Sequence, residues 1–448
     1  MRELKGSQPA VFEAIKIWLS LDGGGMYLLQ GIAGTGKSFL CADIVWYIKQ
    51  KGNPVVTSPT HKSLRVLKQF VGNNVDYFTI HAALGMKEVI EEDGKRSFMR
   101  DSNLGCPADE YTHIIIDEAS MLDDSIFYEL LDFVEQGKKI LFIGDPMQIP
   151  PVNHEYSMPF NHQVRTDYNI GVSTLEVIIR QEENNPIIEN AANIRTNIRN
   201  INGISQRQTV KNNIGEVSFI KRGDEYAFFT DNILPLYKSP EYDHNIDHVK
   251  VIGWRNKTVD SYNTMIRGYM FGENIPKIMV GDKLIADAPI FDDDNSTILI
   301  STNEEMEVVN TEIDHDHISE DFILTYYKTH VKVYNESDYN EYILRIIHEE
   351  SEKTYQEILK LQKYLAKTHY RKGSFESRSA WIDYYNFIKY WHAVKYSYCV
   401  TAHKSQGSTY YTAMVLEYDI RANPEVFERN RILYTAATRP SKNLYIIY

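Results

Sequence analysis

One stretch near the N-terminus has the residue types and spacing of a loop that holds phosphate groups. Residues 31–38 read Gly-Ile-Ala-Gly-Thr-Gly-Lys-Ser. Glycines let backbone N–H groups converge on phosphate oxygens, and a helix that begins here adds partial positive charge. The pattern predicts that Lys37 reaches the β- and γ-phosphates of ATP and that the Ser38 hydroxyl ligates Mg²⁺. A glycine-rich turn without a ligand is the alternative. The predicted cofactor-binding residues of the loop are Gly31, Ala33, Gly34, Thr35, Gly36, Lys37 and Ser38.

Two acids follow an apolar run later in the chain. Residues 113–116 read His-Ile-Ile-Ile, a buried-strand pattern, and Asp117 and Glu118 stand directly after it. In proteins with a phosphate loop, an acid at this position holds Mg²⁺, and a second acid positions or deprotonates the attacking water. The sequence therefore predicts Asp117 as a metal ligand and Glu118 as the activator of water. Two solvated acids that cap a helix are the alternative.

Two glutamines have amides that can read a nucleotide. Gln148 follows a strand pattern at 139–144, in a turn stiffened by prolines, so it can sense a γ-phosphate and relay its loss. Gln8 stands in the first turn of a helix predicted over 7–19. Its amide can offer a donor and an acceptor to an adenine edge. For Gln8 alone, an exposed polar side chain is the alternative.

The elements that position these residues alternate between short apolar runs and helical periodicity, which predicts an α/β fold. Ligands of open parallel sheets bind beyond the carboxyl ends of strands, and the polar cluster at 58–62 falls at such a place. A short helix with Thr79 as its cap follows. In the second half, residues 174–181 read as a strand that delivers Arg180, and Arg439 falls in the last turn of a helix over 431–439.

Periodicity changes in the middle of the chain. Short alternating runs between 278 and 333 are consistent with a small β barrel. Helical stretches at 349–367 and 381–391 look like a helical hairpin. The predicted organisation is a first domain at 1–172 that contains a hairpin insertion at 86–112, a second domain in two segments at 173–277 and 397–448, and an insertion at 278–396.

A β-hairpin is predicted between residues 89 and 99. Asp93-Gly94 between two short runs is the strongest brief hairpin signal. An isolated ribbon is marginally stable, so this finger should pack on a neighbour or on a ligand. Phe98 lies near its stem or tip, where its ring either stacks on a base pair or anchors the ribbon by packing.

Composition bounds the function classes. The 448 residues are enough for roughly two to four domains. A formal net charge of −13 argues against a general polyanion binder, but a narrow groove for one strand needs only local cations and aromatic rings. No apolar run of about 18 residues and no charged-then-apolar leader is present, so we expect a cytoplasmic protein without a membrane span. Cys41, Cys106 and Cys399 lie far apart, which indicates reduced thiols.

Taken in order, these motifs form a set that resembles superfamily 1 helicases. The chain looks most like the Dda-type DNA helicases of tailed bacteriophages, in the RecD-like 1B branch. The matching stretches are Gln8, 31–38, 58–61, 79–81, 117–120, 144–145 with Gln148, Arg180, 403–407 and 434–439. Residues 117–120 read Asp-Glu-Ala-Ser and differ slightly from the usual family pattern, a difference from which we expect no cost. The region between Arg180 and His403 has little support from motifs.

The resemblance implies two RecA-like domains with ATP between them and single-stranded DNA across their top. The barrel would be an SH3-like module, and the helical hairpin a tower that leans toward the finger. It implies 5′-to-3′ movement and unwinding of duplex DNA in phage replication or recombination, in the host cytoplasm. The expected partners are single-stranded DNA, fork or overhang duplexes and a single-stranded-DNA-binding protein, and a monomer is expected.

The resemblance also assigns roles to individual residues. Arg180 and Arg439 would be arginine fingers from the second domain, worth about 10³ to 10⁵ in rate. Gln406 and Gly407 would lie at the nucleotide. The residues expected to contact DNA are Pro59, Thr60, His61, Thr79, His81, Phe98, Thr401, His403 and Lys404. For each histidine taken alone, a structural hydrogen-bonding role is the alternative.

Other functions stay open at the level of the sequence. A non-enzymatic ATP-dependent switch, or an assembly factor like a clamp loader, would use the same phosphate loop to order a partner. It would need neither a strand-separating finger nor arginines delivered within one chain. An ATPase that translocates without unwinding and an RNA helicase are two further alternatives.

Overall fold

The computed structural model describes residues 3–90, 96–100, 105–151, 154–177, 185–201, 204, 206–292, 298–319, 322–334, 339–368, 370 and 374–448. The chain divides into two compact units. The first unit comprises Met1–Gly85, Ser102–Ile266 and Tyr398–Tyr448, and the second comprises Met86–Asp101 and Arg267–Ser397. No helix in the described ranges is long and apolar enough to cross a membrane. Cys41, Cys106 and Cys399 form no disulfide with one another.

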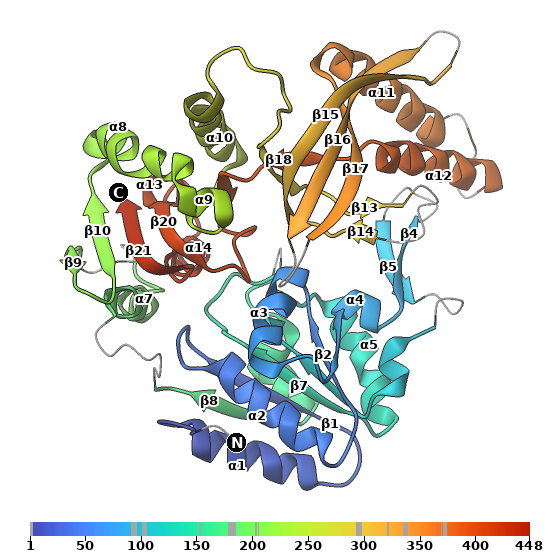
Figure 1. Ribbon diagram of the computed structural model, residues 1–448. Coiled ribbons are helices and arrows are strands. Elements are labelled where there is room, and N and C mark those ends of the chain that lie inside the picture. The colour runs from blue at the N-terminus through green and yellow to red at the C-terminus, as the bar shows by residue number, and fades with distance from the viewer. Residues whose placement is uncertain are drawn as a thin grey trace. The chain divides into compact units, whose positions relative to one another are not determined.

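The first unit begins with a six-stranded parallel sheet, in the order β3-β2-β6-β7-β1-β8 (Figure 1). Its strands β2 and β7 are buried throughout, because helices cover both faces of a parallel sheet. The strands are β1 (Gly25–Gly31), β2 (Pro54–Ser58), β3 (Asp76–Thr79), β6 (His113–Ile116), β7 (Lys139–Gly144) and β8 (Gly171–Leu175). The helices are α1 (Gln8–Ser20), α2 (Lys37–Lys49), α3 (His61–Val71), α4 (Ile80–Ala83), α5 (Asp124–Glu135) and α6 (His162–Asp167). We call this sheet with its helices and connections, residues 3–85 and 105–177, the first α/β half.

The end of the first sheet differs from the prediction. β8 pairs with β1 up to the contact between Leu175 and Gly31. The predicted boundary between 172 and 173 therefore cuts through a strand of the first sheet and lies too early. The pairing of β8 with β1 joins segments more than a hundred residues apart, which local periodicity does not report.

A second six-stranded sheet has the order β19-β11-β20-β21-β10-β9, and only β9 in it is antiparallel to its neighbour. The strands are β9 (Val210–Lys211), β10 (Glu216–Ile220), β11 (Val249–Gly253), β19 (Cys399–Thr401), β20 (Tyr410–Leu416) and β21 (Pro440–Ile447). The helices are α7 (Pro186–Thr196), α8 (Glu225–Phe228), α9 (Pro240–His244), α10 (Asn256–Phe271), α13 (Glu417–Ile420) and α14 (Val426–Ala437). Residues 185–266 and 398–448 form the second α/β half.

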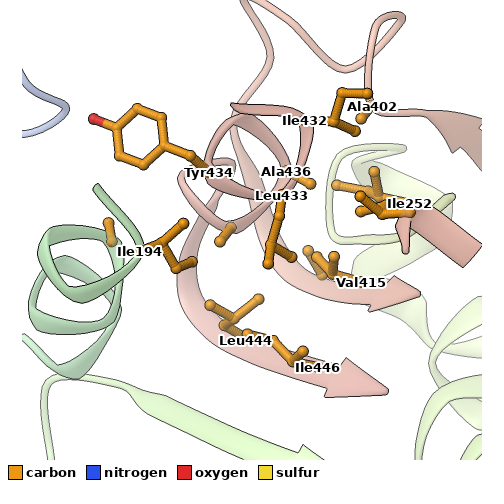
Figure 2. Packing of buried hydrophobic residues seen from close by; sticks show 14 of the residues in the cluster. Ile194, Ile252, Ala402, Val415, Ile432, Leu433, Tyr434, Ala436, Leu444 and Ile446 are labelled. Atoms are coloured by element: carbon orange, nitrogen blue, oxygen red, sulfur yellow. The ribbon is translucent and has the colours of Figure 1, made fainter. Parts of the chain in front are cut away.

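The core of the second half lies between α7, α14 and the sheet. Figure 2 shows aliphatic side chains of β20 and β21 packed under α14, with Ile194 of α7 beside them. Ile149, which follows β7 in the chain, belongs to the same buried cluster. A segment of the first half is thus built into the core of the second.

The second compact unit contains a five-stranded antiparallel sheet, in the order β17-β16-β15-β12-β18. Its strands and the separate β13-β14 pair are β12 (Lys283–Ala286), β13 (Ile290–Phe291), β14 (Ile298–Ile300), β15 (Glu305–His317), β16 (Ile323–Tyr334), β17 (Tyr339–Ile347) and β18 (Val394–Tyr396). The predicted small barrel is not confirmed. β15 and β16 are long strands of 13 and 12 residues, and within the described strands β17 and β18 are the two edges of the sheet.

Two helices of the second unit pack against each other (Figure 1), as the helical periodicity predicted. α11 runs from Glu352 to Thr368 and α12 from Phe375 to Tyr390. α12 begins earlier than the predicted 381, because Ser374 caps it by accepting the N–H of Ser377.

The predicted β-hairpin is confirmed in its paired strands. β4 (Met86–Ile90) and β5 (Arg96–Arg100) are antiparallel, and the turn with Asp93-Gly94 lies outside the described residues. β4 contacts α12, and both belong to the second compact unit. The ribbon is thus inserted into the first half along the chain but packs with the second unit, in keeping with the need of a lone ribbon for a neighbour.

Candidate active site

The phosphate loop joins β1 to α2. Gly34 and Gly36 have φ values of +84° and +76°, in the left-handed region that favours glycine. A Cβ atom on Gly36 would also lie 2.5 Å from Nε2 of Gln8. Thr35 is fully buried, and its hydroxyl donates to the carbonyl oxygen of Ile32 at 2.8 Å. The loop is therefore a tight cradle at the N-terminus of α2, and its backbone fits a nucleotide phosphate.

Gln8 lies against this loop. Its side chain is buried, and Nε2 donates to the carbonyl oxygens of Gly36 at 3.3 Å and Thr35 at 3.4 Å. Its Oε1 accepts the N–H of Lys5 at 3.2 Å. The alternative of an exposed side chain is wrong, because the amide of Gln8 is fixed on the phosphate loop.

Lys37 is the first residue of α2. Its Nζ donates to the carbonyl oxygens of Gly31 at 2.8 Å and Ile32 at 3.1 Å. Burial lowers the pKa of Lys37, and the negative charges of Asp145, Glu118 and Asp117 oppose that shift. The ammonium is thus held on the loop among carboxylates, where phosphate oxygens can take over from the carbonyl groups.

The two acids lie directly after β6. Glu118 has φ 52° and ψ 38°, a left-handed conformation that is uncommon outside glycine and tends to occur at functional sites. Burial and the charge of Glu118 raise the pKa of Asp117 to about 7, against the effect of Lys37. A divalent cation would favour the charged form of such a buried carboxyl, so Asp117 and the Ser38 hydroxyl have the chemistry of a Mg²⁺ site.

Gln148 lies in the segment 145–156, which follows β7. Its side chain is buried, and within the described residues Oε1 has no hydrogen-bond partner. An unsatisfied buried amide oxygen is costly and calls for an explanation. A site that completes its partners only when nucleotide and water are bound would explain it.

Side chains of the second half bind this segment. Arg431 donates from Nε to the carbonyl oxygen of Gln148 and from Nη2 to that of Pro146, both at 2.9 Å, and from Nη1 to that of Glu155. Burial lowers the pKa of Arg431 to about 10. The guanidinium is therefore a buried cation satisfied by backbone carbonyls of the other half.

Both backbone polar groups of Ile149 form hydrogen bonds with side chains of the second half. The hydroxyl of Thr435 accepts its N–H at 3.2 Å, and Nε2 of Gln406 donates to its carbonyl oxygen at 3.1 Å. Gln406, predicted at the nucleotide, thus contacts the segment that carries Gln148.

Asp145 is the most connected residue of the segment. It is fully buried, with Oδ1 accepting from Nη1 of Arg195 at 2.8 Å and Oδ2 from the hydroxyl of Tyr434 at 2.7 Å. The Tyr434 oxygen in turn accepts the N–H of Ala33 in the phosphate loop at 3.3 Å. The loop, Asp145 and the second half therefore meet at one place.

Sequence reasoning assigned no role to four of these residues. Asp145 and Tyr434 stood inside the matched motifs, and for Asp145 the position directly after a strand was a usable signal. Arg195 and Arg431 lie on helices where no spacing marks them.

Of the two predicted arginine fingers, only Arg439 belongs to the described residues. Arg180 lies outside the described residues. Arg439 follows α14, which ends at Ala437, so its predicted place in the last turn is wrong. Its guanidinium donates to the Thr435 carbonyl, the Ser408 carbonyl and the Thr438 hydroxyl, at 3.0, 3.4 and 3.0 Å. These three contacts lie within the second half, and the role of Arg439 as an arginine finger stays a prediction.

Thr60, a predicted DNA contact of the first half, lies near Gly407 of the second half, which was predicted at the nucleotide. Thr60 caps α3, and its hydroxyl lies 2.7 Å from that of Ser63. A Cβ atom on Gly407 would lie 2.3 Å from the Ser63 hydroxyl. Gly407 has φ +73°, a backbone conformation that favours glycine. Gly407 and the first turn of α3 therefore lie side by side.

Of the remaining predicted contacts, Thr79 caps α4 as expected, by accepting the N–H of Ala82. Burial lowers the pKa of the nearby His81. The hydroxyl of Thr401 accepts the N–H of Lys404. Phe98 lies on β5 in the other compact unit. The predicted residues not yet placed are Pro59, which is partly buried before α3, and His61 and His403, which are exposed.

Two family models match the chain. Residues 5–213 match an AAA domain, and residues 396–447 match a UvrD-like helicase C-terminal domain. The ATP-dependent DNA helicase Dda of Enterobacteria phage T4 is 24% identical over 440 residues, which are 94% of this chain and 93% of that protein. The ATP-dependent RecD2 DNA helicase of Deinococcus radiodurans is 30% identical over 172 residues, which are 38% of this chain and 22% of that protein.

A solved structure shows a similar fold. The crystal structure of Pif1 helicase from Candida albicans aligns with a TM-score of 0.52 and 16% identity, over 100% of this chain and 94% of that one. The architecture is thus a two-domain α/β helicase fold with parallel sheets.

Proposed function

Because the chain is a superfamily 1B helicase that resembles Dda and RecD, we propose that it moves 5′-to-3′ along single-stranded DNA and unwinds duplex DNA as it hydrolyses ATP. We place this activity in phage DNA replication or recombination. Its substrates would be single-stranded DNA and fork or overhang duplexes, and it would act as a monomer beside a single-stranded-DNA-binding protein.

One observation carries the proposal. The hydroxyl of Tyr434, from the second half, accepts the N–H of Ala33 in the phosphate loop. A nucleotide in that loop would thus adjoin a side chain of the other half. Hydrolysis can then change how the two halves sit against each other, which is what a translocating motor needs.

The phosphate loop and its neighbours have the groups for hydrolysis. In our proposal Lys37 clamps the phosphates, and Ser38 and Asp117 hold Mg²⁺, which neutralises charge that develops on the phosphoryl oxygens. Glu118 accepts a proton from the attacking water. Gln148, with its unsatisfied Oε1, orients that water or senses the γ-phosphate.

We place the strand path along the segments 59–61 and 401–407, because Gly407 lies near Thr60 at the start of α3. One segment belongs to each half, so the halves can hold the strand in turn. Contacts of this kind go mainly to phosphates and base faces, so they tolerate any sequence.

Strand-displacement assays test the proposal. Duplexes of DNA and of RNA, each with a 5′ or a 3′ overhang, are incubated with ATP and Mg²⁺. We expect displacement only of DNA with a 5′ overhang. Displacement from a 3′ overhang would show that the protein moves 3′-to-5′. Displacement of RNA duplexes would show that RNA is a substrate. ATP turnover stimulated by single strands without displacement would indicate a translocase, and no turnover would indicate a switch.

A further inference from the structure

A buried junction links the phosphate loop to the second half through one hydroxyl group. The Tyr434 hydroxyl oxygen accepts from Ala33 N at 3.3 Å and donates its proton to Oδ2 of Asp145 at 2.7 Å. Arg195 binds the other carboxylate oxygen at 2.8 Å. Asp145 follows a strand of the first half, whereas Tyr434 and Arg195 belong to helices of the second. The carboxylate is therefore shared between the halves.

The Tyr434 side chain is fixed at two ends, by the core of the second half at α14 and by hydrogen bonds at its hydroxyl. Figure 2 shows its side chain leaving α14 with the hydroxyl pointing away from the aliphatic side chains of the core. Burial and the charge of Asp145 raise the pKa of Tyr434, so the hydroxyl keeps its proton and remains a donor. Its direction is thus fixed by the core of the second half at one end and by the first half at the other.

Arg195 adds a charge that acts on the nucleotide site. The Arg195 guanidinium and the Asp145 carboxylate both act electrostatically on Lys37, the ammonium expected to clamp phosphates. The side chain of Arg195 is 26% exposed, and within the described residues its guanidinium has Asp145 as its hydrogen-bond partner. Phosphate charge would compete with Asp145 for both cations.

We infer that Tyr434 and Arg195 are positioning residues that couple nucleotide binding to strand binding, with Asp145 as their shared partner. This inference rests on the proposed function and names the contact through which its two binding events communicate. A phosphate that attracts Arg195 draws one hydrogen-bond partner away from a fully buried carboxylate. Because such a carboxylate needs its donors, the side chains that supply them shift with it. Both belong to the second half.

A thermodynamic cycle tests the coupling. The affinity for a fluorescent oligo-dT strand is measured by anisotropy with and without the non-hydrolysable analogue AMP-PNP. We expect the two dissociation constants of the wild type to differ by about five-fold or more. Tyr434→Phe keeps the ring and removes the hydroxyl, so this ratio should fall to within about two-fold of one. By reciprocity, the effect of the strand on the affinity for the analogue should shrink equally.

The chain offers a matched control for Tyr434. Tyr237 is also fully buried, and its hydroxyl donates to the Tyr398 carbonyl at 2.7 Å within the second half. Tyr237→Phe loses a hydrogen bond of the same kind away from the phosphate loop. Both variants should lower the melting temperature, but only Tyr434→Phe should change the ratio.

Arg195→Gln keeps the inference testable if Tyr434→Phe fails to fold. Its control is Arg207→Gln, because Arg207 is 27% exposed and binds the fully buried Glu417 at 2.6 Å within the second half. We expect the ratio to fall in Arg195→Gln and to persist in Arg207→Gln. If Arg195→Gln and Tyr434→Phe both keep the wild-type ratio of dissociation constants, the junction stabilises the fold but does not couple the two binding events. If the wild type binds strand and nucleotide but its strand dissociation constant is the same with and without AMP-PNP, the inference is wrong and the proposed function stands. If the wild type binds no strand, the proposed function is wrong.

Discussion

Arg431 donates its Nε hydrogen to the backbone carbonyl oxygen of Gln148 at 2.9 Å. The residue expected to sense the γ-phosphate is therefore held by a helix of the other half. Ile149, the next residue, packs in the core of that half. The segment after β7 is continuous with the first sheet but fastened to the second. A change at the γ-phosphate would then be transmitted directly to the second half through the segment after β7.

Replacing Arg431 by Met should loosen that fastening. The change removes the donor from the buried carbonyl oxygen of Gln148 and from the partly buried ones of Pro146 and Glu155, and a buried carbonyl left without a donor costs about 1–3 kcal/mol. We expect the free energy of unfolding, measured in urea, to fall by about 3 kcal/mol or more. Arg199→Met is the control, because Arg199 also binds Glu155 but is largely exposed and should cost less than about 0.5 kcal/mol. Equal losses in the two variants would remove Arg431 from this role.

Lys37→Ala should abolish ATP turnover and leave the fold intact. Within the described residues the ammonium donates to two carbonyl oxygens of its own loop, so its removal costs a phosphate clamp and little packing. Glu118→Gln should bind ATP and fail to hydrolyse it, because an amide keeps the shape but accepts no proton. Turnover and nucleotide binding are measured together with circular dichroism. A normal rate in Lys37→Ala would contradict the ATPase assignment.

Asp117→Asn should change the pH dependence of stability. The pKa of Asp117 is raised from 3.8 to about 7 in the folded state, so the stability it contributes is full below its unfolded pKa and is lost as pH rises through about 7. The amide of Asn does not titrate. Without nucleotide and Mg²⁺, the free energy of unfolding of the variant should therefore rise relative to that of the wild type as the pH increases from about 5 to about 8. Each pKa unit is about 1.4 kcal/mol, and we expect a relative gain of at least about 1 kcal/mol in urea unfolding.

Metal supplies the control for that experiment. Mg²⁺ with ADP should stabilise the charged carboxylate of the wild type, so the difference in free energy of unfolding between wild type and Asp117→Asn should become smaller at about pH 8. We expect no ATP turnover by the variant. Parallel pH curves for wild type and Asp117→Asn would show that this carboxyl does not control the effect.

Local signals explain which parts of the fold and site were predictable. The strand before Asp117 and Glu118, the glycines at 34 and 36 and the Thr79 cap each depend on neighbours within a few residues, and each lies where the sequence placed it. Contacts of high sequence separation gave no such signal. Asp145 and Tyr434 are 289 residues apart, and no periodicity relates them.

The antiparallel sheet shows the same limit. Alternation within 278–333 correctly indicated strands, but a strand pattern does not state how long the ladder is or whether it closes. β15 and β16 pair over nearly their whole length, from Glu307 with Lys332 to His317 with Ile323. The predicted barrel assumed short strands, which is why it was not confirmed.

The last prediction concerns Phe98 on β5 of the hairpin, whose ring is 44% exposed. If this ring stacks on the last base pair of a duplex, it contributes about 1–3 kcal/mol per base. That is comparable to the mean DNA stacking energy of about 1.4 kcal/mol per step, so one ring can matter. Phe98→Ala should therefore slow unwinding of DNA duplexes while it spares ATP turnover and movement on single strands.

Met99 gives that experiment its control. It is the next residue on β5 and 54% exposed, and because successive side chains of a strand point to opposite faces, it faces the other side of the ribbon. Met99→Ala should unwind as the wild type does. Phe98→Leu separates the two roles of the ring, since a packing role tolerates leucine and a stacking role does not. Full unwinding by Phe98→Ala would exclude this ring from strand separation, and equal slowing in Phe98→Ala and Met99→Ala would mean that the ribbon had merely been destabilised.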